Sequence, residues 1–165
     1  EMVVNETQSF RGSFIMFGMI MLEVPTLVLL IVLWQKGKLG EDGLPAVLFV
    51  GAIILVTFLF LMSIKLELRM DDKSISFRNP PLKNNWQKIP FSEINSIQVK
   101  KMDGLLEYGG IGVRYSKNVK AYIFFSDHVV EVQLQKKKLV FSTRKHNEFK
   151  EMIEVWNENG FENET

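Results

Sequence analysis

Two long apolar segments near the start of the chain dominate its pattern of hydrophobic and polar positions. The first extends from about residue 13 to 34 and the second from about 44 to 64, with a short polar stretch between them. Phe14–Trp34 and Leu44–Ile64 are each 21 residues long, so as helices they would measure ~31 Å, close to the ~30 Å hydrocarbon thickness of a bilayer. Buried helices of a soluble protein are the alternative, but two such segments would leave no polar face for water. The pattern predicts a transmembrane helical hairpin over residues 1–64.

After residue 64 the hydrophobic residues no longer follow the spacing of a helix. They alternate with polar residues, with the period of two that is typical of a β-strand. Lys65–Met70 alternates strictly, which places Leu66, Leu68 and Met70 on one face of a strand. Turn residues then separate a series of short segments of the same character. The predicted strands are Lys65–Met70, Ser74–Phe77, Trp86–Ile89, Ser96–Met102, Val113–Tyr115, Lys120–Phe125, Val129–Leu134 and Lys138–Ser142. We expect the sixth and seventh of these strands to form a hairpin around residues 126–128.

The last apolar pattern has helical spacing and covers about residues 145–159. Phe149, Met152, Ile153 and Trp156 lie at positions i, i+3, i+4 and i+7, which gives one apolar stripe along the helix. Short strands followed by one amphipathic helix resemble the order of a pleckstrin-homology barrel, in which the helix covers an open end. The pattern predicts an α+β protein in which a pleckstrin-homology-like antiparallel β-barrel occupies residues 65–160. The stripe is the expected lid of this barrel, and residues 161–165 are the expected tail.

The segment Tyr108–Tyr115, with the pattern Tyr-Gly-Gly-x-Gly-x-Arg-Tyr, is the most distinctive stretch of the chain. Together with further segments it resembles small bacterial membrane proteins that join an N-terminal two-helix hairpin to a pleckstrin-homology-like domain. Those segments are Glu6–Arg11, Lys65–Glu67, Trp86–Ile94, Leu106–Glu107, Lys120–Tyr122 and Leu139–Lys145. The resemblance implies this architecture and a location in the bacterial cytoplasmic (inner) membrane. It implies no catalytic or binding residues, because the family has no assigned activity.

Basic residues near the helix ends predict the orientation of the hairpin. Five lie on the side of the two outer ends, and two lie in the connecting loop. Basic residues favour the cytoplasmic side of a membrane, so we expect a multi-pass protein with both termini in the cytoplasm. The five are Arg11, Lys65, Arg69, Lys73 and Arg78, and the two are Lys36 and Lys38.

Composition and charge narrow the class of function. The net charge of +1 combines −2 over residues 1–64 with +3 over residues 65–165, and a balance of +3 is too small to indicate nucleic-acid binding. The chain has no cysteine, which excludes disulfides, thiolate metal sites and thiol catalysis. No metal-ligand spacing pairs His128 or His146 with another ligand. The glycine-rich segment 109–112 lacks the Lys-Ser/Thr pair and the following helix that a phosphate-binding loop requires. We therefore expect no catalytic residue, metal or cofactor.

Two hypotheses of function remain, both without catalysis. The first is an interaction or scaffold module that presents its barrel close to the bilayer to another membrane protein or to a second copy. The second is a sensor of anionic lipid headgroups through the basic turn Lys136, Lys137 and Lys138, where each base near a membrane surface contributes ~1 kcal/mol. The same lysines could instead form a solvated turn that prevents edge-to-edge strand pairing.

Glu23 is the one charged residue within the apolar segments. A carboxylate near the middle of a span costs at least ~2.5 kcal/mol, and the second span offers no base to compensate it. Pro25 lies two residues further on and leaves a backbone carbonyl without its donor. Glu23 could bond locally, within this kink or to Thr57. The alternative is an assembly contact with a polar group on another copy or on a partner helix.

Overall fold

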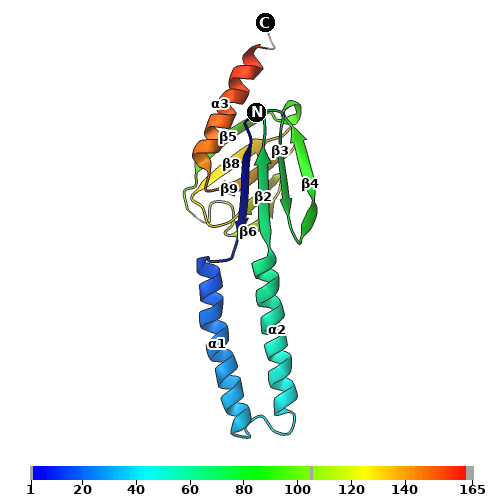
Figure 1. Ribbon diagram of the computed structural model, residues 1–165, viewed down its shortest axis with the longest axis vertical. Helices are drawn as coiled ribbons and strands as arrows, with labels where there is room; N and C mark the ends of the chain where they lie inside the picture. Colours follow the sequence, from blue (N-terminus) through cyan, green and yellow to red (C-terminus); the bar gives the residue numbers. More distant parts are fainter. Residues whose placement is uncertain (1, 105, 163–165) are drawn as a thin grey trace. The chain divides into compact units, whose positions relative to one another are not determined.

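The computed structural model describes residues 2–104 and 106–162, and the chain divides into two compact units (Figure 1). One unit is Ser9–Ile64, and the other joins Glu1–Gln8 to Lys65–Thr165. The two units meet between Gln8 and Ser9 and again between Ile64 and Lys65. The first residues belong with the sheets because they form a strand, β1 (Val4–Ser9), that pairs with the strand following the hairpin.

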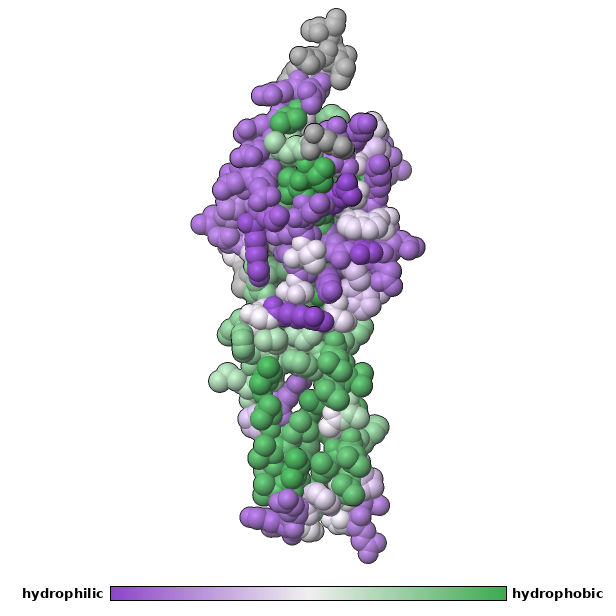
Figure 2. Space-filling model, viewed as in Figure 1, coloured by the Kyte–Doolittle hydropathy of each residue, from purple (hydrophilic) through white to green (hydrophobic). Residues whose placement is uncertain are grey.

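The smaller unit consists of two long apolar helices, as the sequence predicted. Helix α1 (Phe14–Gln35) and helix α2 (Gly43–Ser63) are both long and apolar enough to cross a membrane, and no residue of their most apolar windows is buried. Hydrophobic side chains cover both helices on the face seen in Figure 2. Ser13 caps α1 by accepting a hydrogen bond from the Met16 N–H at 3.4 Å. The guanidinium of Arg11 donates to the carbonyl of Met62 at 3.1 Å, which links the two outer ends of the hairpin.

The first sheet of the larger unit has the order β1-β2-β3-β4. Strand β2 (Lys65–Met70) pairs antiparallel with β3 (Ser74–Asn79), which pairs antiparallel with β4 (Lys83–Pro90). Leu66, Leu68 and Met70 are all buried, as expected from the period of two in this segment. A single 3-10 turn, η1 (Phe91–Glu93), follows β4 and leads to the second sheet.

The second sheet has the order β5-β8-β9-β7-β6. Its strands are β5 (Ser96–Lys101), β6 (Gly112–Ser116), β7 (Val119–Ile123), β8 (His128–Gln133) and β9 (Lys138–Thr143). The prediction of a hairpin between the segments now called β7 and β8 is wrong, because β9 lies between them and runs parallel to β7. The prediction of a purely antiparallel arrangement fails at the same pair.

The connection between β7 and β8 explains this crossover. It passes over the end of β9, where the Phe124 N–H donates to Ser142 Oγ at 2.8 Å and the Ser126 hydroxyl donates to the Thr143 carbonyl. These bonds satisfy backbone groups that a hairpin partner would otherwise have satisfied. The alternating pattern of β7 and β8 is the same in both arrangements, so the pattern could not distinguish them.

Aromatic side chains fill the space between the two sheets. The ring of Phe77 on β3 lies 5.3 Å from that of Tyr122 on β7 and 4.8 Å from that of Phe141 on β9. The described strands form two sheets packed in this way and no closed barrel. The prediction of an α+β protein with an apolar hairpin and a C-terminal helix is confirmed.

Helix α3 (His146–Glu162) packs on β5 and β8. The four residues of the apolar stripe, Phe149, Met152, Ile153 and Trp156, are all buried. The helix continues past the predicted end at residue 159 into the expected tail, because a glycine at position 160 is tolerated within a helix at a cost of about 1 kcal/mol. The rest of the expected tail, residues 163–165, lies outside the described residues.

Candidate functional site

A buried polar cluster joins β1 to the end of β9. The Gln8 amide donates to the Ser142 carbonyl at 2.5 Å and accepts from the Ser142 hydroxyl at 2.9 Å. Glu6 accepts from the Thr143 hydroxyl at 2.6 Å and from the Arg144 N–H at 2.8 Å. Sequence reasoning missed this cluster because β1 turns polar side chains inward. The available signal was the period of two in Val4, Glu6 and Gln8, which are the buried positions of the strand. Each of these side chains has a partner within its own pair or group, so the cluster is structural.

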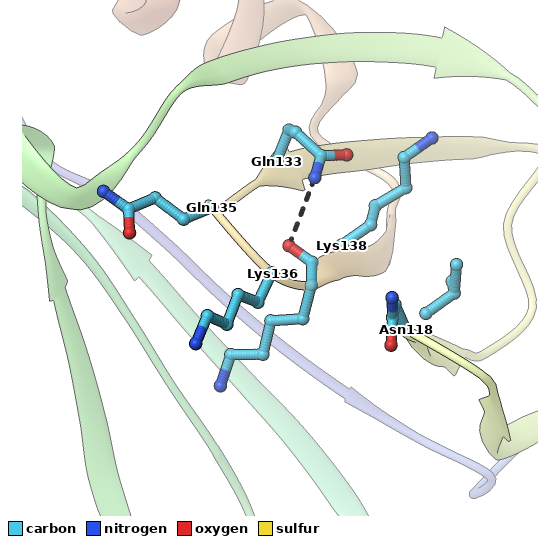
Figure 3. Close-up of a pocket in the computed structure, with 7 residues that line it drawn as sticks. Asn118, Gln133, Gln135, Lys136 and Lys138 are labelled. Atoms are coloured by element: carbon cyan, nitrogen blue, oxygen red, sulfur yellow. Dashed lines mark hydrogen bonds between the residues drawn. The ribbon is translucent and has the colours of Figure 1, made fainter.

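The three lysines of the basic turn do not act alike. Lys138 begins β9, and its ammonium lies 3.4 Å from the buried carboxylate of Glu131. Lys136 and Lys137 are exposed and have no ion-pair partner among the described residues. Figure 3 shows the side chains of Lys136 and Lys138 pointing away from each other. Only two of the three predicted contact residues are therefore free to meet an anion.

An open groove of about 540 Å³ runs along this turn (Figure 3). Its floor is held by the Gln133 amide, which donates to the Leu134 carbonyl at 2.8 Å and to the Lys137 carbonyl at 3.5 Å. The groove is lined by Asn118, Val119, Gln133, Gln135, Lys136, Lys137 and Lys138.

The turn between β6 and β7 lies beside the basic turn and adds a third lysine. The Lys138 N–H donates to the Asn118 carbonyl at 2.8 Å, which fixes the two turns side by side. Lys117 on this turn is exposed, has a positive φ of 43° and forms no ion pair with a described residue. We call Lys117, Lys136 and Lys137 the basic rim. The sequence did not indicate Lys117, because its proximity to the other two follows from the parallel pairing of β7 and β9.

Glu131 is the centre of a second polar cluster on the same sheet. Its carboxylate accepts hydrogen bonds from the Tyr108 hydroxyl, from the Gln98 amide at 2.7 Å and from Lys138. Burial raises the pKa of Glu131, but these hydrogen bonds and the Lys138 charge outweigh it, so the pKa is lowered overall. Burial and the bond to Glu131 both raise the pKa of Tyr108. The cluster anchors the glycine-rich segment to β8 and contains no unbonded base or nucleophile.

The two histidines that the sequence treated as isolated lie together. The rings of His128 and His146 are stacked, with centroids 3.9 Å apart and planes 8° from parallel. Asp127 Oδ1 lies 2.9 Å from His128 Nδ1. No group of three or more metal-binding side chains is found within residues 2–104 and 106–162. The glycine-rich segment precedes a strand, β6, rather than a helix.

Glu23 faces a groove between the two helices of the smaller unit. The groove has a volume of about 170 Å³. In the part of the chain that the structure describes, the Glu23 carboxyl forms no hydrogen bond or ion pair, and neither of the expected local bonds is present. The nearby Thr26 hydroxyl donates to the Leu22 carbonyl at 2.7 Å instead. The groove is lined by Ile20, Glu23, Val24 and Leu27 of α1 and by Gly51, Ile54, Leu55 and Phe58 of α2.

Comparison of the chain with protein-family models, with curated proteins and with solved structures finds no match. The resemblance to hairpin-bearing bacterial membrane proteins therefore stays a prediction.

Proposed function

We propose that this protein is a non-enzymatic interaction module, anchored in the bacterial inner membrane by its hairpin and presenting its two-sheet domain to the cytoplasm. The observation that carries this proposal is the exposed apolar surface of α1 and α2. A core helix of a soluble protein would be mostly buried. Exposed apolar surface of this extent requires a hydrocarbon or protein environment.

The place of the hairpin in the chain supports a tethered domain. The hairpin is inserted between β1 and β2, which are neighbours in one sheet. Only residues 10–13 separate β1 from α1, and Ile64 alone separates α2 from β2. Two such short connections would keep the domain close to the membrane, within reach of another membrane protein.

We also propose that the domain is a variant of the pleckstrin-homology-like architecture. Two sheets packed through aromatic side chains and a C-terminal helix with a buried apolar stripe support this assignment. The parallel pairing of β7 with β9 and the additional strand β1 are the departures from that architecture. A shared fold carries no activity with it.

The anchoring is tested by extraction of membranes that contain the full chain. We expect the protein to remain in the membrane pellet at alkaline pH and to be released by mild detergent. The control is a variant in which a short Gly-Asn-Gly turn replaces residues 10–64, and we expect this variant in the soluble fraction. Release of the full chain by alkali would contradict the proposal. Co-purification from mild detergent, followed by identification of bound proteins, then tests the interaction role.

The basic rim favours a second candidate function, recognition of anionic headgroups. Its three lysines lie on adjacent turns and have no carboxylate partner among the described residues. We expect Lys117→Ser/Lys136→Ser/Lys137→Ser to abolish salt-sensitive binding of the hairpin-free variant to vesicles of phosphatidylglycerol. The matched control, Lys73→Ser/Lys83→Ser/Lys150→Ser, removes the same charge elsewhere and should bind normally. Equal loss in both variants, or no binding by the parent, would contradict this function.

A further inference from the structure

We infer that the groove containing Glu23 is the contact through which two copies of this chain associate within the membrane. The inference rests on the proposed membrane anchoring and names the partner that the anchoring leaves open. It starts from the position of the Glu23 side chain, which lines a groove otherwise formed by apolar residues and glycine.

Among the described residues, the Glu23 carboxyl has no hydrogen-bond or ion-pair partner. The nearby hydroxyl groups donate to backbone carbonyls instead. On α1 the Thr26 hydroxyl donates to the Leu22 carbonyl, and on α2 the Ser63 hydroxyl donates to the Phe60 carbonyl. Thr57 is exposed and does not line the groove. No lysine or arginine occurs in Phe14–Gln35 or Gly43–Ser63. A carboxyl group in hydrocarbon needs a partner, and intramembrane acids face protein rather than lipid.

A second copy provides this partner by symmetry. A protonated carboxyl carries one donor and an acceptor, so two of them bond each other reciprocally. A two-fold axis along the membrane normal brings the same residue of both copies to the same depth, which is the isologous arrangement of most homodimers. A different partner helix would need a polar group at that particular depth.

The shape of the groove also suits a helix contact. Gly51 lies on the α2 side, and a Cβ added there would meet Leu27 Cδ2 at 3.7 Å, an ordinary contact distance. The absence of a side chain at this position leaves the groove open rather than filled. Small residues at helix surfaces allow a second helix to approach closely.

The absence of cysteine from the chain makes cross-linking a direct test. In native membranes, oxidation of Val24→Cys, within the groove, should give disulfide-linked dimers at least fivefold more abundant than oxidation of Leu29→Cys. Leu29 is the matched control, because it does not line the groove, and five residues separate it from Val24 and place it about 140° around α1. Equal cross-linking at both positions would overturn the inference.

The role of Glu23 itself is tested in the Val24→Cys background. Glu23→Gln keeps a donor and an acceptor and should retain the dimer, whereas Glu23→Leu should reduce cross-linking at least tenfold. Undiminished dimer with Glu23→Leu, or cross-linking to a different protein in place of the second copy, would overturn the inference. Alkaline extraction of the same membranes distinguishes the two proposals. A chain that stays in the pellet but does not cross-link refutes the dimer alone. A chain that is released by alkali refutes the anchoring.

Discussion

The indole of Trp156 donates a hydrogen bond to the backbone carbonyl of Asp71 at 2.7 Å. This bond joins the last helix to the turn between β2 and β3, on the sheet opposite to the one on which α3 packs. The ring of Phe91 meets the same indole edge-on, with centroids 4.6 Å apart. Trp156 therefore connects α3 to both sheets, and it does so with a polar bond as well as with apolar area.

Replacement of Trp156 should reveal both contributions. We expect Trp156→Ala to lower the free energy of unfolding by ~3–5 kcal/mol, as large-to-small changes in a core do. Trp156→Phe keeps a ring but loses the hydrogen bond, so its cost should be nearer ~1 kcal/mol. Urea unfolding followed by near-ultraviolet circular dichroism gives both values. A loss below ~1 kcal/mol for the alanine variant would mean that the stripe of α3 does not hold the sheets together.

The Glu131 cluster predicts how stability depends on pH. The pKa of Glu131 is lower in the folded protein than in the unfolded chain, so its contribution is present above the unfolded value of about 4.3 and is lost as the pH falls through the folded value. The pKa of Tyr108 is raised, so its contribution is present below about 10 and is lost as the pH rises further.

Single variants separate these two limbs. Glu131→Gln should lower the free energy of unfolding at pH 7 by ~1–3 kcal/mol and flatten its decline between about pH 5 and 3. Tyr108→Phe should flatten the alkaline limb, and it should weaken the acidic limb only in part, because Gln98 and Lys138 still lower the pKa of Glu131. Thermal melting over this pH range is the measurement. An unchanged acidic limb in Glu131→Gln would show that other carboxylates determine the loss of stability in acid.

The domain without its hairpin should be more stable when β1 is present. We expect the variant with residues 10–64 replaced by Gly-Asn-Gly to be soluble and to unfold cooperatively. A fragment of residues 65–165 alone lacks Glu6 and Gln8 and leaves polar groups at the end of β9 unpaired, so it should be less stable by at least ~2 kcal/mol, from two or more lost buried hydrogen bonds. Urea unfolding of the two proteins side by side is the test. Equal stability would assign β1 no part in the core.

The orientation of the hairpin is open to a reporter experiment. An enzyme active only outside the cytoplasm should be inactive when fused after Thr165 and active when inserted at Gly40, because the basic residues favour the cytoplasmic side for the outer ends. Immunoblotting for equal amounts of the two fusions is the control. The reverse pattern would place the domain outside the cytoplasm.

The sequence predicts well those features that depend only on the spacing of hydrophobic side chains within one segment. The apolar spans, the alternation of Lys65–Met70 and the stripe of α3 follow from side-chain spacing alone. The crossover of β7 and β8 depends instead on which strand occupies the space between them, and no local pattern encodes that choice. β1 was missed because two of its three inward positions, Glu6 and Gln8, are polar. Their partners lie at the far end of the chain, in Ser142, Thr143 and Arg144.

The candidate site residues, Glu23 and the lysines, were also predicted only in part. Sequence reasoning identified Glu23 and Lys136–Lys138 from charge alone, and the structure divides the lysines by their partners. Lys138 is paired with Glu131, whereas Lys117 joins Lys136 and Lys137 through the contact of two turns. Charge patterns indicate which residues are polar but not which of them remain free after folding.

The insertion of the hairpin between two paired strands sets an order of events for folding. Glu6 meets Thr143, which is made 137 positions later, so β1 leaves the ribosome long before its partners in β9 exist. Contacts this distant in sequence carry a large cost of loop closure and form slowly. The bond from Arg11 to Met62 brings the outer ends of the hairpin together. Assembly of the two helices should thereby shorten the effective loop between β1 and β2, so we expect the helices to pair before these two strands do.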